Sequence, residues 1–254
     1  MFSSYVAIGD SFTEGYGDDL PDGSIRGWAD LVALGMTAAS AEPVEYANLA
    51  IRGRKLAPLL AEQLQPAIEM HPQLISLNGG GNDILRPRVG IGGLAAQLAA
   101  AARRIVGADI HVLLLSGANP SRHLPAGRLI RRRGQQLDDA VLATYPRAGV
   151  TFVDNWADRE LSDIRYWSAD RMHLNALGHV RVATNVLTAL DVPVPEEWSD
   201  LTPAGTAHDR NLRYYREYVL PWIGRRLARQ SSGDGRLPKI PTLAPVAPGL
   251  SISA

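Results

Sequence analysis

A serine, an aspartate and a histidine in this sequence have the types and spacing needed for nucleophilic attack on a carbonyl group. Ser11 follows a short apolar segment, and Asp170 and His173 lie three residues apart much further along the chain. A serine hydroxyl becomes a strong nucleophile when a base removes its proton, and that base is usually a histidine oriented by a carboxylate. Asp170 and His173 can share one turn, which lets the carboxylate reach the imidazole Nδ1. The alternative for each residue is structural: a helix-capping serine, a capping aspartate and a surface histidine.

Two glycine-containing segments offer hydrogen-bond donors for the oxyanion of such a reaction. Asn82, in the segment 79–83, has a side-chain amide, and Gly53 has an unobstructed backbone N–H. The backbone N–H of Ser11 makes a third donor. Removing one donor of this kind raises the reaction barrier by about 2.7–4 kcal/mol. The two segments therefore favour a functional interpretation of Ser11 over a structural one.

Short apolar segments recur along the chain, and each ends in Gly, Asn, Asp or Ser, which is typical of buried parallel strands. Segments with helical spacing lie between them. This alternation predicts a three-layer α/β/α sandwich around a five-stranded parallel sheet of flavodoxin-like order. Ligands bind at the carboxyl ends of such strands, where the candidate residues lie. The predicted strands cover residues 5–8, 44–47, 74–77, 110–115 and 150–153.

Individual residues mark where the predicted helices break, end or begin. Pro66 cannot donate a backbone hydrogen bond, so we expect it to kink or split a helix predicted over 56–68. Gly107 is expected to end one core helix, and Asn175 to cap the last one. His179 is expected on a face of that last helix rather than in the site.

Four short blocks, at residues 9–12, 48–53, 81–83 and 170–173, occur in an order typical of one enzyme family. Three follow the first three predicted strands and the fourth precedes the last core helix. The chain resembles the SGNH hydrolases, also called the GDSL family of lipases and esterases, over about residues 5–190. The resemblance implies the SGNH hydrolase fold and a carboxylic ester hydrolase. Phe12 stands where the family motif has Leu, and we expect its side chain to point away from the chemistry.

The resemblance also implies a role for each residue that matches a block. Ser11 corresponds to the nucleophile, His173 to the general base and Asp170 to the acid that orients it. Ser11, Gly53 and Asn82 correspond to the donors of the oxyanion hole. Gly53 lies in a short block, and Arg52 and Arg54 flank it.

A change in composition divides the chain into three parts. We predict a hydrolase domain over 1–192, a linker and C-terminal helical extension over 193–230, and a flexible tail over 231–254 that is rich in Ser, Gly and Pro. Within the extension, residues 208–229 have helical spacing, and Trp222 is expected to dock on the hydrolase domain.

The overall composition excludes several classes of partner and chemistry. Lys and Arg number 26, as do Asp and Glu, so the net charge of zero gives no global attraction to nucleic acid or anionic membranes. The absence of Cys excludes disulfides, thiolate metal sites and cysteine nucleophiles. No leader pattern is evident, and no apolar stretch approaches the ~18 residues of a membrane span. We expect a cytoplasmic protein, without membrane insertion, that acts on a small-molecule ester.

No metal and no organic cofactor are expected, and the oligomeric state is not predictable. The glycines at 79–81 are not followed by the Lys-Ser/Thr of a phosphate-binding loop. The histidines outside the fourth block show no metal-ligand spacing with one another. They are His71, His111, His123, His179 and His208.

Two groups of arginines have different expected roles, substrate contact for one and a solvated helix face for the other. Arg86 and Arg88 follow the block that contains Asn82, so we expect them to contact the substrate. Arg128 and the arginines at 131–133 are instead expected to form a solvated helix face.

The residues leave more than one function open. The favoured function is hydrolysis of small or short-chain acyl esters through an acyl-enzyme on Ser11, because no long apolar insertion suggests a lipid-binding lid. The alternatives are an acyltransferase or deacetylase that acts on an acylated sugar, and a non-catalytic binding protein of the same fold. The α/β-hydrolase fold is excluded because it needs a Gly-x-Ser-x-Gly elbow, which is absent here.

Overall fold

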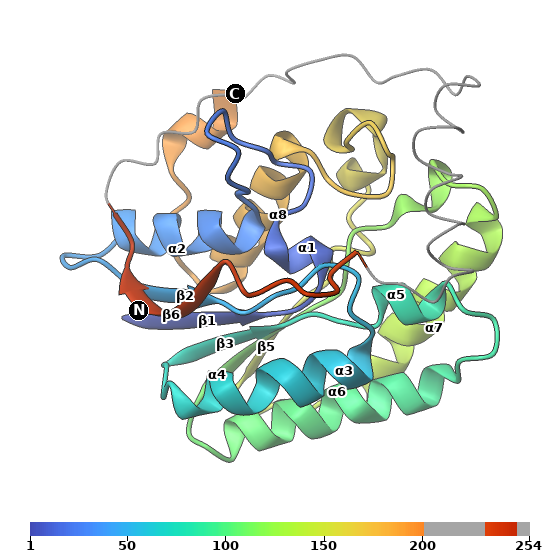
Figure 1. Cartoon of the computed structure of the whole chain (residues 1–254), viewed down its shortest axis with the longest axis horizontal. Coiled ribbons are helices and arrows are strands. Elements are labelled where there is room, and N and C mark those ends of the chain that lie inside the picture. The colour runs from blue at the N-terminus through green and yellow to red at the C-terminus, as the bar shows by residue number, and fades with distance from the viewer. Residues whose placement is uncertain (201–231, 248–254) are drawn as a thin grey trace.

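The computed structural model describes residues 1–200 and 232–247 and has a six-stranded sheet at its centre (Figure 1). The strand order is β5-β4-β3-β1-β2-β6, and all neighbours are parallel except β2 and β6. The five predicted parallel strands and their flavodoxin-like order are therefore confirmed. The strands are β1 Ser4–Ile8, β2 Glu45–Asn48, β3 Leu74–Leu77, β4 His111–Leu115, β5 Val150–Val153 and β6 Ile240–Pro245.

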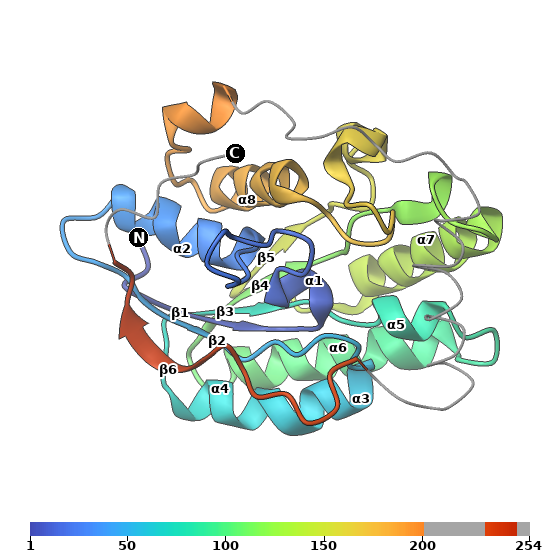
Figure 2. The ribbon, with the colours of Figure 1, turned by 45° about the horizontal axis from the view of Figure 1, so that its top comes forward.

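Helices cover both faces of the sheet and make the three layers (Figure 2). Side chains alternate along each strand, so Tyr5 and Ala7 enter one apolar cluster while Val6 and Ile8 enter the other. Helices α2 and α8 pack on the first face; α3, α4, α6 and α7 pack on the second. The helices are α1 Ser11–Glu14, α2 Trp28–Ala38, α3 Leu56–Leu59, α4 Gln65–Glu69, α5 Gly81–Ile84, α6 Ile91–Val106, α7 Gly127–Thr144 and α8 Ala176–Ala189.

The predicted helix boundaries agree with the structure where a capping or breaking residue marked them. Gly107 ends α6, and the side chain of Asn175 caps α8 by accepting the N–H of Gly178 at 3.0 Å. Pro66 lies at the start of α4, which is separated from α3 by a π-helical turn, Leu60–Leu64. A π turn is a common way for a helix to accommodate a break in its hydrogen-bond ladder. No helix of the described residues is long and apolar enough to cross a bilayer.

Part of the segment expected to be a flexible tail is instead a strand. Residues 240–245 form β6, which pairs antiparallel with β2 at the edge of the sheet. Pro241 and Pro245 do not prevent this, because proline is tolerated on an edge strand, where one side of the backbone has no partner. The helical prediction over 208–229, with Trp222, lies outside the described residues, and the boundaries at 192 and 230 stay predictions.

Candidate active site

The candidate triad forms a continuous chain of hydrogen bonds, although its members come from opposite ends of the domain. Ser11 is the first residue of α1, and its Oγ lies 3.1 Å from His173 Nε2. The other ring nitrogen of His173, Nδ1, lies 2.6 Å from Asp170 Oδ2. Both distances suit proton transfer from a serine to a histidine that a carboxylate orients.

Asp170 is held in place by its second oxygen. Oδ1 accepts hydrogen bonds from Ser168 Oγ at 2.7 Å and from the N–H groups of Met172 at 2.9 Å and His173 at 3.0 Å. Burial alone would raise the pKa of Asp170, but the adjacent His173 and these donors outweigh it and hold that pKa far below its usual range. The carboxylate is therefore ionised and can stabilise a protonated imidazole.

His173 is also supported on its ring by a network that begins in α1. The edge of Tyr16 meets the His173 ring with 4.6 Å between centroids. The Arg52 guanidinium lies 4.4 Å from the centre of the Tyr16 ring and forms a buried ion pair with Glu14, with Nη2 and Oε1 2.6 Å apart. A continuous series of contacts therefore leads from Glu14 through Arg52 and Tyr16 to the His173 ring.

The loop that contains Gly53 is tied to α1 by the same ion pair. The Arg52 N–H donates to Glu14 Oε2 at 2.7 Å, and the Ile51 N–H donates to the carbonyl of Gly9 at 3.3 Å. Gly53 has a φ of +73°, a backbone conformation that favours glycine. Ser11 and Asn82 line the pocket described below, whereas Gly53 does not.

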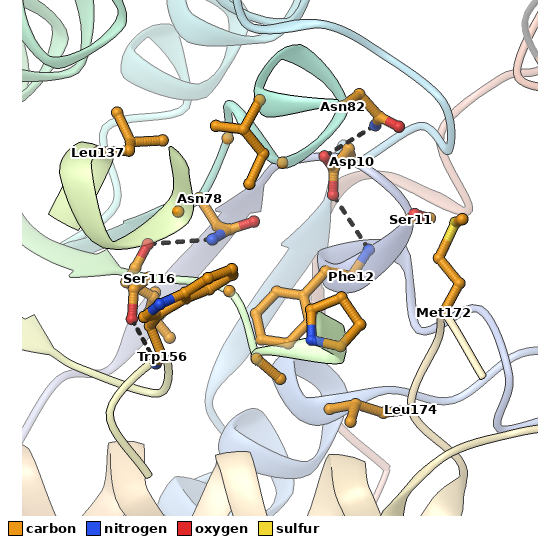
Figure 3. Close-up of a pocket in the computed structure, with 18 of the residues that line it drawn as sticks. Asp10, Ser11, Phe12, Asn78, Asn82, Ser116, Leu137, Trp156, Met172 and Leu174 are labelled. Atoms are coloured by element: carbon orange, nitrogen blue, oxygen red, sulfur yellow. Dashed lines mark hydrogen bonds between the residues drawn. The ribbon is translucent and has the colours of Figure 1, made fainter. Parts of the chain in front are cut away.

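Asn82 connects the first three sequence blocks. Its Nδ2 donates to Asp10 Oδ2 at 3.1 Å (Figure 3) and to the carbonyl of Arg54, also at 3.1 Å. Asp10 precedes Ser11 and Arg54 follows Gly53, so one side chain holds both segments. Because both amide hydrogens are engaged, Asn82 must exchange one of these bonds to donate to an oxyanion. Burial raises the pKa of Asp10 to about 6, partly offset by the N–H of Phe12.

Gln63 is a further residue of the site that the sequence interpretation missed. Its Oε1 accepts the Gly9 N–H at 2.8 Å, and its Nε2 donates to the Gly9 carbonyl at 3.0 Å. Gln63 belongs to the π-helical turn Leu60–Leu64. This turn therefore fixes the position of both backbone groups of Gly9, two residues before Ser11. A signal was available, because Gln63 is a polar residue on the apolar stripe of its helical segment.

Lys239, in the segment just before β6, links the C-terminal segment to α1 and to the residues after it. We call its three contacts the Lys239 clamp. Its Nζ donates to the carbonyls of Glu14 at 2.6 Å and Ile25 at 3.0 Å, and it pairs with Asp30 Oδ2 at 2.6 Å. The C-terminal segment therefore supports the helix that carries Ser11.

Replacing Lys239 by Met should destabilise the protein. The change keeps the aliphatic stem but leaves Asp30, whose side chain is 13% exposed, without its ion-pair partner. We expect the free energy of unfolding to fall by about 3 kcal/mol, as measured by denaturant unfolding. Lys55→Met, at an exposed position, is the control and should change it by less than about 0.5 kcal/mol. Equal unfolding midpoints for Lys239→Met and Lys55→Met would show that the contacts of Lys239 do not stabilise the protein.

A pocket with a volume of about 140 Å³ opens at Ser11 and His173 and extends between the sheet and α7. Phe12 lines it (Figure 3), so the expectation that this side chain points away was wrong; its ring centre lies 5.7 Å from that of Trp28. Most of the lining is apolar. Its inner part is made by Leu98, Leu114, Ile130, Leu137, Val141, Phe152 and Trp156.

The arginines that were expected to bind substrate do not line this pocket. Neither Arg86 nor Arg88 is part of its wall. Arg133, expected on a solvated face, is buried and donates to the carbonyls of Ile84 at 2.7 Å and Arg86 at 3.0 Å. These bonds hold the backbone of the 84–89 loop against α7, which explains an arginine in the apolar stripe of that helix.

His179 was expected on a helix face, and it lies on the buried face of α8. Its Nδ1 accepts the Trp28 N–H at 3.2 Å, and burial lowers its pKa to about 3. The neutral ring is therefore buried in the core, and it also lines the pocket at Ser11, contrary to the expectation that it lies outside the site. Within 1–200 and 232–247, no three His, Asp or Glu side chains are placed to hold a metal ion.

Comparisons with known proteins give the family and the fold of this chain. The model of the GDSL-like Lipase/Acylhydrolase family matches residues 7–181. The chain belongs to this family. This GDSL hydrolase is a carboxylic ester hydrolase with the fold of its family. A search of curated proteins found no match.

Solved structures share the fold of this GDSL hydrolase at low sequence identity. The lipase Lip_vut3 from a goat rumen metagenome has a TM-score of 0.62 and 19% identity, with 76% of this chain and 99% of that chain covered. The acetylxylan esterase Axe2 from Geobacillus stearothermophilus has a TM-score of 0.58 and 19% identity over 76% and 97%. The psychrotrophic esterase EstA from Pseudoalteromonas sp. has a TM-score of 0.54 and 15% identity over 78% and 100%.

Proposed function

We propose that this GDSL hydrolase cleaves small or short-chain carboxylic esters through an acyl-enzyme on Ser11. The observation that carries the proposal is the unbroken chain from Ser11 Oγ through His173 to Asp170 at the opening of an apolar pocket. A nucleophile, a base and an orienting carboxylate in this order are the parts that acyl transfer requires.

The reaction follows from these contacts. Ser11 Oγ attacks the ester carbonyl carbon while His173 Nε2 accepts the hydroxyl proton. The N–H of Ser11 and the Asn82 amide stabilise the oxyanion of the tetrahedral intermediate. Gly53, which does not line the pocket, stays a predicted third donor. His173 then gives the proton to the leaving alcohol as the carbon–oxygen bond breaks. Water attacks the acyl-enzyme by the same route and releases the acid and free Ser11.

The size of the pocket supports a small acyl group. Its volume of about 140 Å³ is below the roughly 300–1,000 Å³ of pockets that hold drug-sized ligands. A long lipid chain would have to extend beyond it.

Deacetylation of an acylated sugar is the second candidate. It is favoured by the similarity in fold to the acetylxylan esterase Axe2. Acetate release from acetylated xylo-oligosaccharides, compared with that from a simple acetate ester at equal concentration, separates the two. Acyl transfer to an added alcohol would instead point to the acyltransferase alternative.

Hydrolysis of p-nitrophenyl esters, from acetate to palmitate, tests the proposal. We expect the wild type to turn over the short esters best and Ser11→Ala to lose at least about 10⁴-fold in kcat/KM. Ser162→Ala, outside the site, is the control and should keep wild-type activity. Equal activity, or equal inertness, of the wild type and Ser11→Ala would reject the proposal and favour a binding protein.

A further inference from the structure

The inner end of the pocket has a polar corner formed by α7 and the segment after β5. The Trp156 ring packs directly on α7 at Gly134, where a Cβ atom would come within 2.0 Å of the ring. Asp138 lies one helical turn further on, so it shares that face of α7 with Gly134. Asp138 and Trp156 both line the pocket. In Figure 3, Trp156 lies on the side of the pocket away from Ser11.

Each of these side chains has a polar atom without a partner. Asp138 Oδ2 and Trp156 Nε1 are buried and form no hydrogen bond with any described residue. The residues are only 6% and 8% exposed, and most of the side chains that line the pocket with them are apolar. Buried polar groups in proteins are nearly always paired, because leaving them unpaired is costly. A ligand group that enters the pocket can supply the missing partner.

The chemistry of the two groups limits what that partner can be. The Trp156 N–H can only donate a hydrogen bond. Burial, together with Asp154 and Asp139, raises the pKa of Asp138 to about 8, so its carboxyl is mostly protonated at neutral pH and can both donate and accept. A hydroxyl oxygen can accept from Trp156 while its hydrogen donates to Asp138.

Charged groups fit this corner less well. An ammonium has no lone pair for the Trp156 N–H. A carboxylate would bring negative charge towards Asp138 and Asp154, and no described Lys or Arg lines the pocket to neutralise it. The corner is enclosed between the sheet and α7, so it suits the acyl part, which stays attached to Ser11, better than the alcohol, which must leave.

We propose that Asp138 and Trp156 form a recognition site for a hydroxyl group on the acyl chain of the substrate, so that this GDSL hydrolase prefers hydroxyacyl esters. The proposal rests on the proposed acyl-enzyme mechanism and names the substrate class for it. It assigns specificity to two residues that take no part in proton transfer at Ser11.

The test compares matched p-nitrophenyl esters of three to six carbons, with and without a hydroxyl at the last or the preceding carbon. Spontaneous lactonisation is subtracted with Ser11→Ala protein. For at least one chain length, we expect the wild type to have an about tenfold higher kcat/KM for the hydroxy ester. Trp156→Phe, which keeps a ring but removes the N–H, and Asp138→Leu should each bring this ratio close to one.

Two controls separate hydrogen bonding from general damage. Asp138→Asn can still donate and accept, so it should retain the preference, and Gln136→Ala, at an exposed position of α7, should leave the ratio unchanged. A ratio near one in the wild type at every chain length, or a ratio that Trp156→Phe leaves intact, would overturn the proposal and leave water as the partner. If Asp138→Leu does not fold, the kcat/KM ratios measured with Trp156→Phe and Asp138→Asn still test the proposal.

The failure of this proposal can be distinguished from failure of the mechanism. Ser11-dependent turnover of the unsubstituted esters reports on the acyl-enzyme, and the hydroxy-to-unsubstituted ratio reports on the corner. Thermal stabilisation of Ser11→Ala protein by each ester provides a second readout that needs no turnover: a larger shift with the hydroxy ester supports the site, and equal shifts contradict it.

Discussion

Asp170→Asn lowers kcat/KM for ester hydrolysis by about 10⁴-fold while the protein remains folded. In the wild type, Asp170 Oδ2 accepts a hydrogen bond from His173 Nδ1–H, and this tautomer leaves Nε2 free to receive the proton of Ser11. An asparagine amide can donate to Nδ1 instead, and this stabilises the tautomer whose Nε2 already carries a proton. It also removes the negative charge that stabilises the protonated ring. Steady-state kinetics, with circular dichroism as the check on folding, measures the effect.

Asp163→Asn is the matched control for this experiment. Asp163 lies in the same part of the chain and accepts a backbone N–H, that of Arg165, at 3.0 Å, but its side chain is 55% exposed and does not contact the triad. Its activity should match that of the wild type. A loss below about tenfold in Asp170→Asn would show that His173 does not need this carboxylate, and the assigned roles would fail.

Glu14→Gln reduces the free energy of unfolding by about 3–5 kcal/mol, a large share of the roughly 5–15 kcal/mol typical of a folded domain. The variant leaves the Arg52 guanidinium buried without its counter-charge; both side chains of the pair are only 9% exposed. Because Arg52 packs on Tyr16 and Tyr16 on His173, kcat should also decrease. Denaturant unfolding and ester kinetics measure the two effects.

A second ion pair of the same chain provides the comparison. Glu62 pairs with Arg54, but its side chain is 44% exposed, so Glu62→Gln should cost less than about 1 kcal/mol. Replacing Glu14 and Arg52 together by Met should recover much of the stability lost in Glu14→Gln, since no buried charge then remains unpaired. Equal losses in Glu14→Gln and Glu62→Gln would mean that burial of the Glu14–Arg52 pair has no energetic consequence.

The sequence predicts the parts of this fold that depend on local pattern. Continuous apolar runs indicated the five parallel strands, because strands covered on both faces contain few polar residues. Helix α2 was missed: small and apolar residues occupy most of Trp28–Ala38, so no clear periodicity marks one face. Strand β6 was missed because Pro241 and Pro245 are typical of a loop, and only its pairing with β2 makes it a strand.

The residues of the candidate site also fall into two groups, those that the sequence predicts and those that it does not. Ser11, Asp170 and His173 are predictable because their order and spacing match a known pattern. Gln63 and Arg133 are not predictable, because their hydrogen-bond partners lie far away in the sequence. Gln63 bonds to Gly9, 54 residues away, and Arg133 bonds to Ile84, 49 residues away. A polar residue in an apolar stripe shows that a partner must exist, but the folded chain is needed to show which one.

Lys239 also has a consequence for the order in which the protein becomes active during its synthesis. The ribosome adds Lys239 66 residues after His173, the difference between 239 and 173, so the triad is complete before Lys239 has been added. At about 5–20 residues per second, the interval from His173 to Lys239 lasts roughly 3 to 13 s. During that time a nascent chain can hold every member of the triad while Asp30 and the Glu14 carbonyl still lack their cation. Full activity should therefore appear only after the clamp has been translated, later than the triad itself.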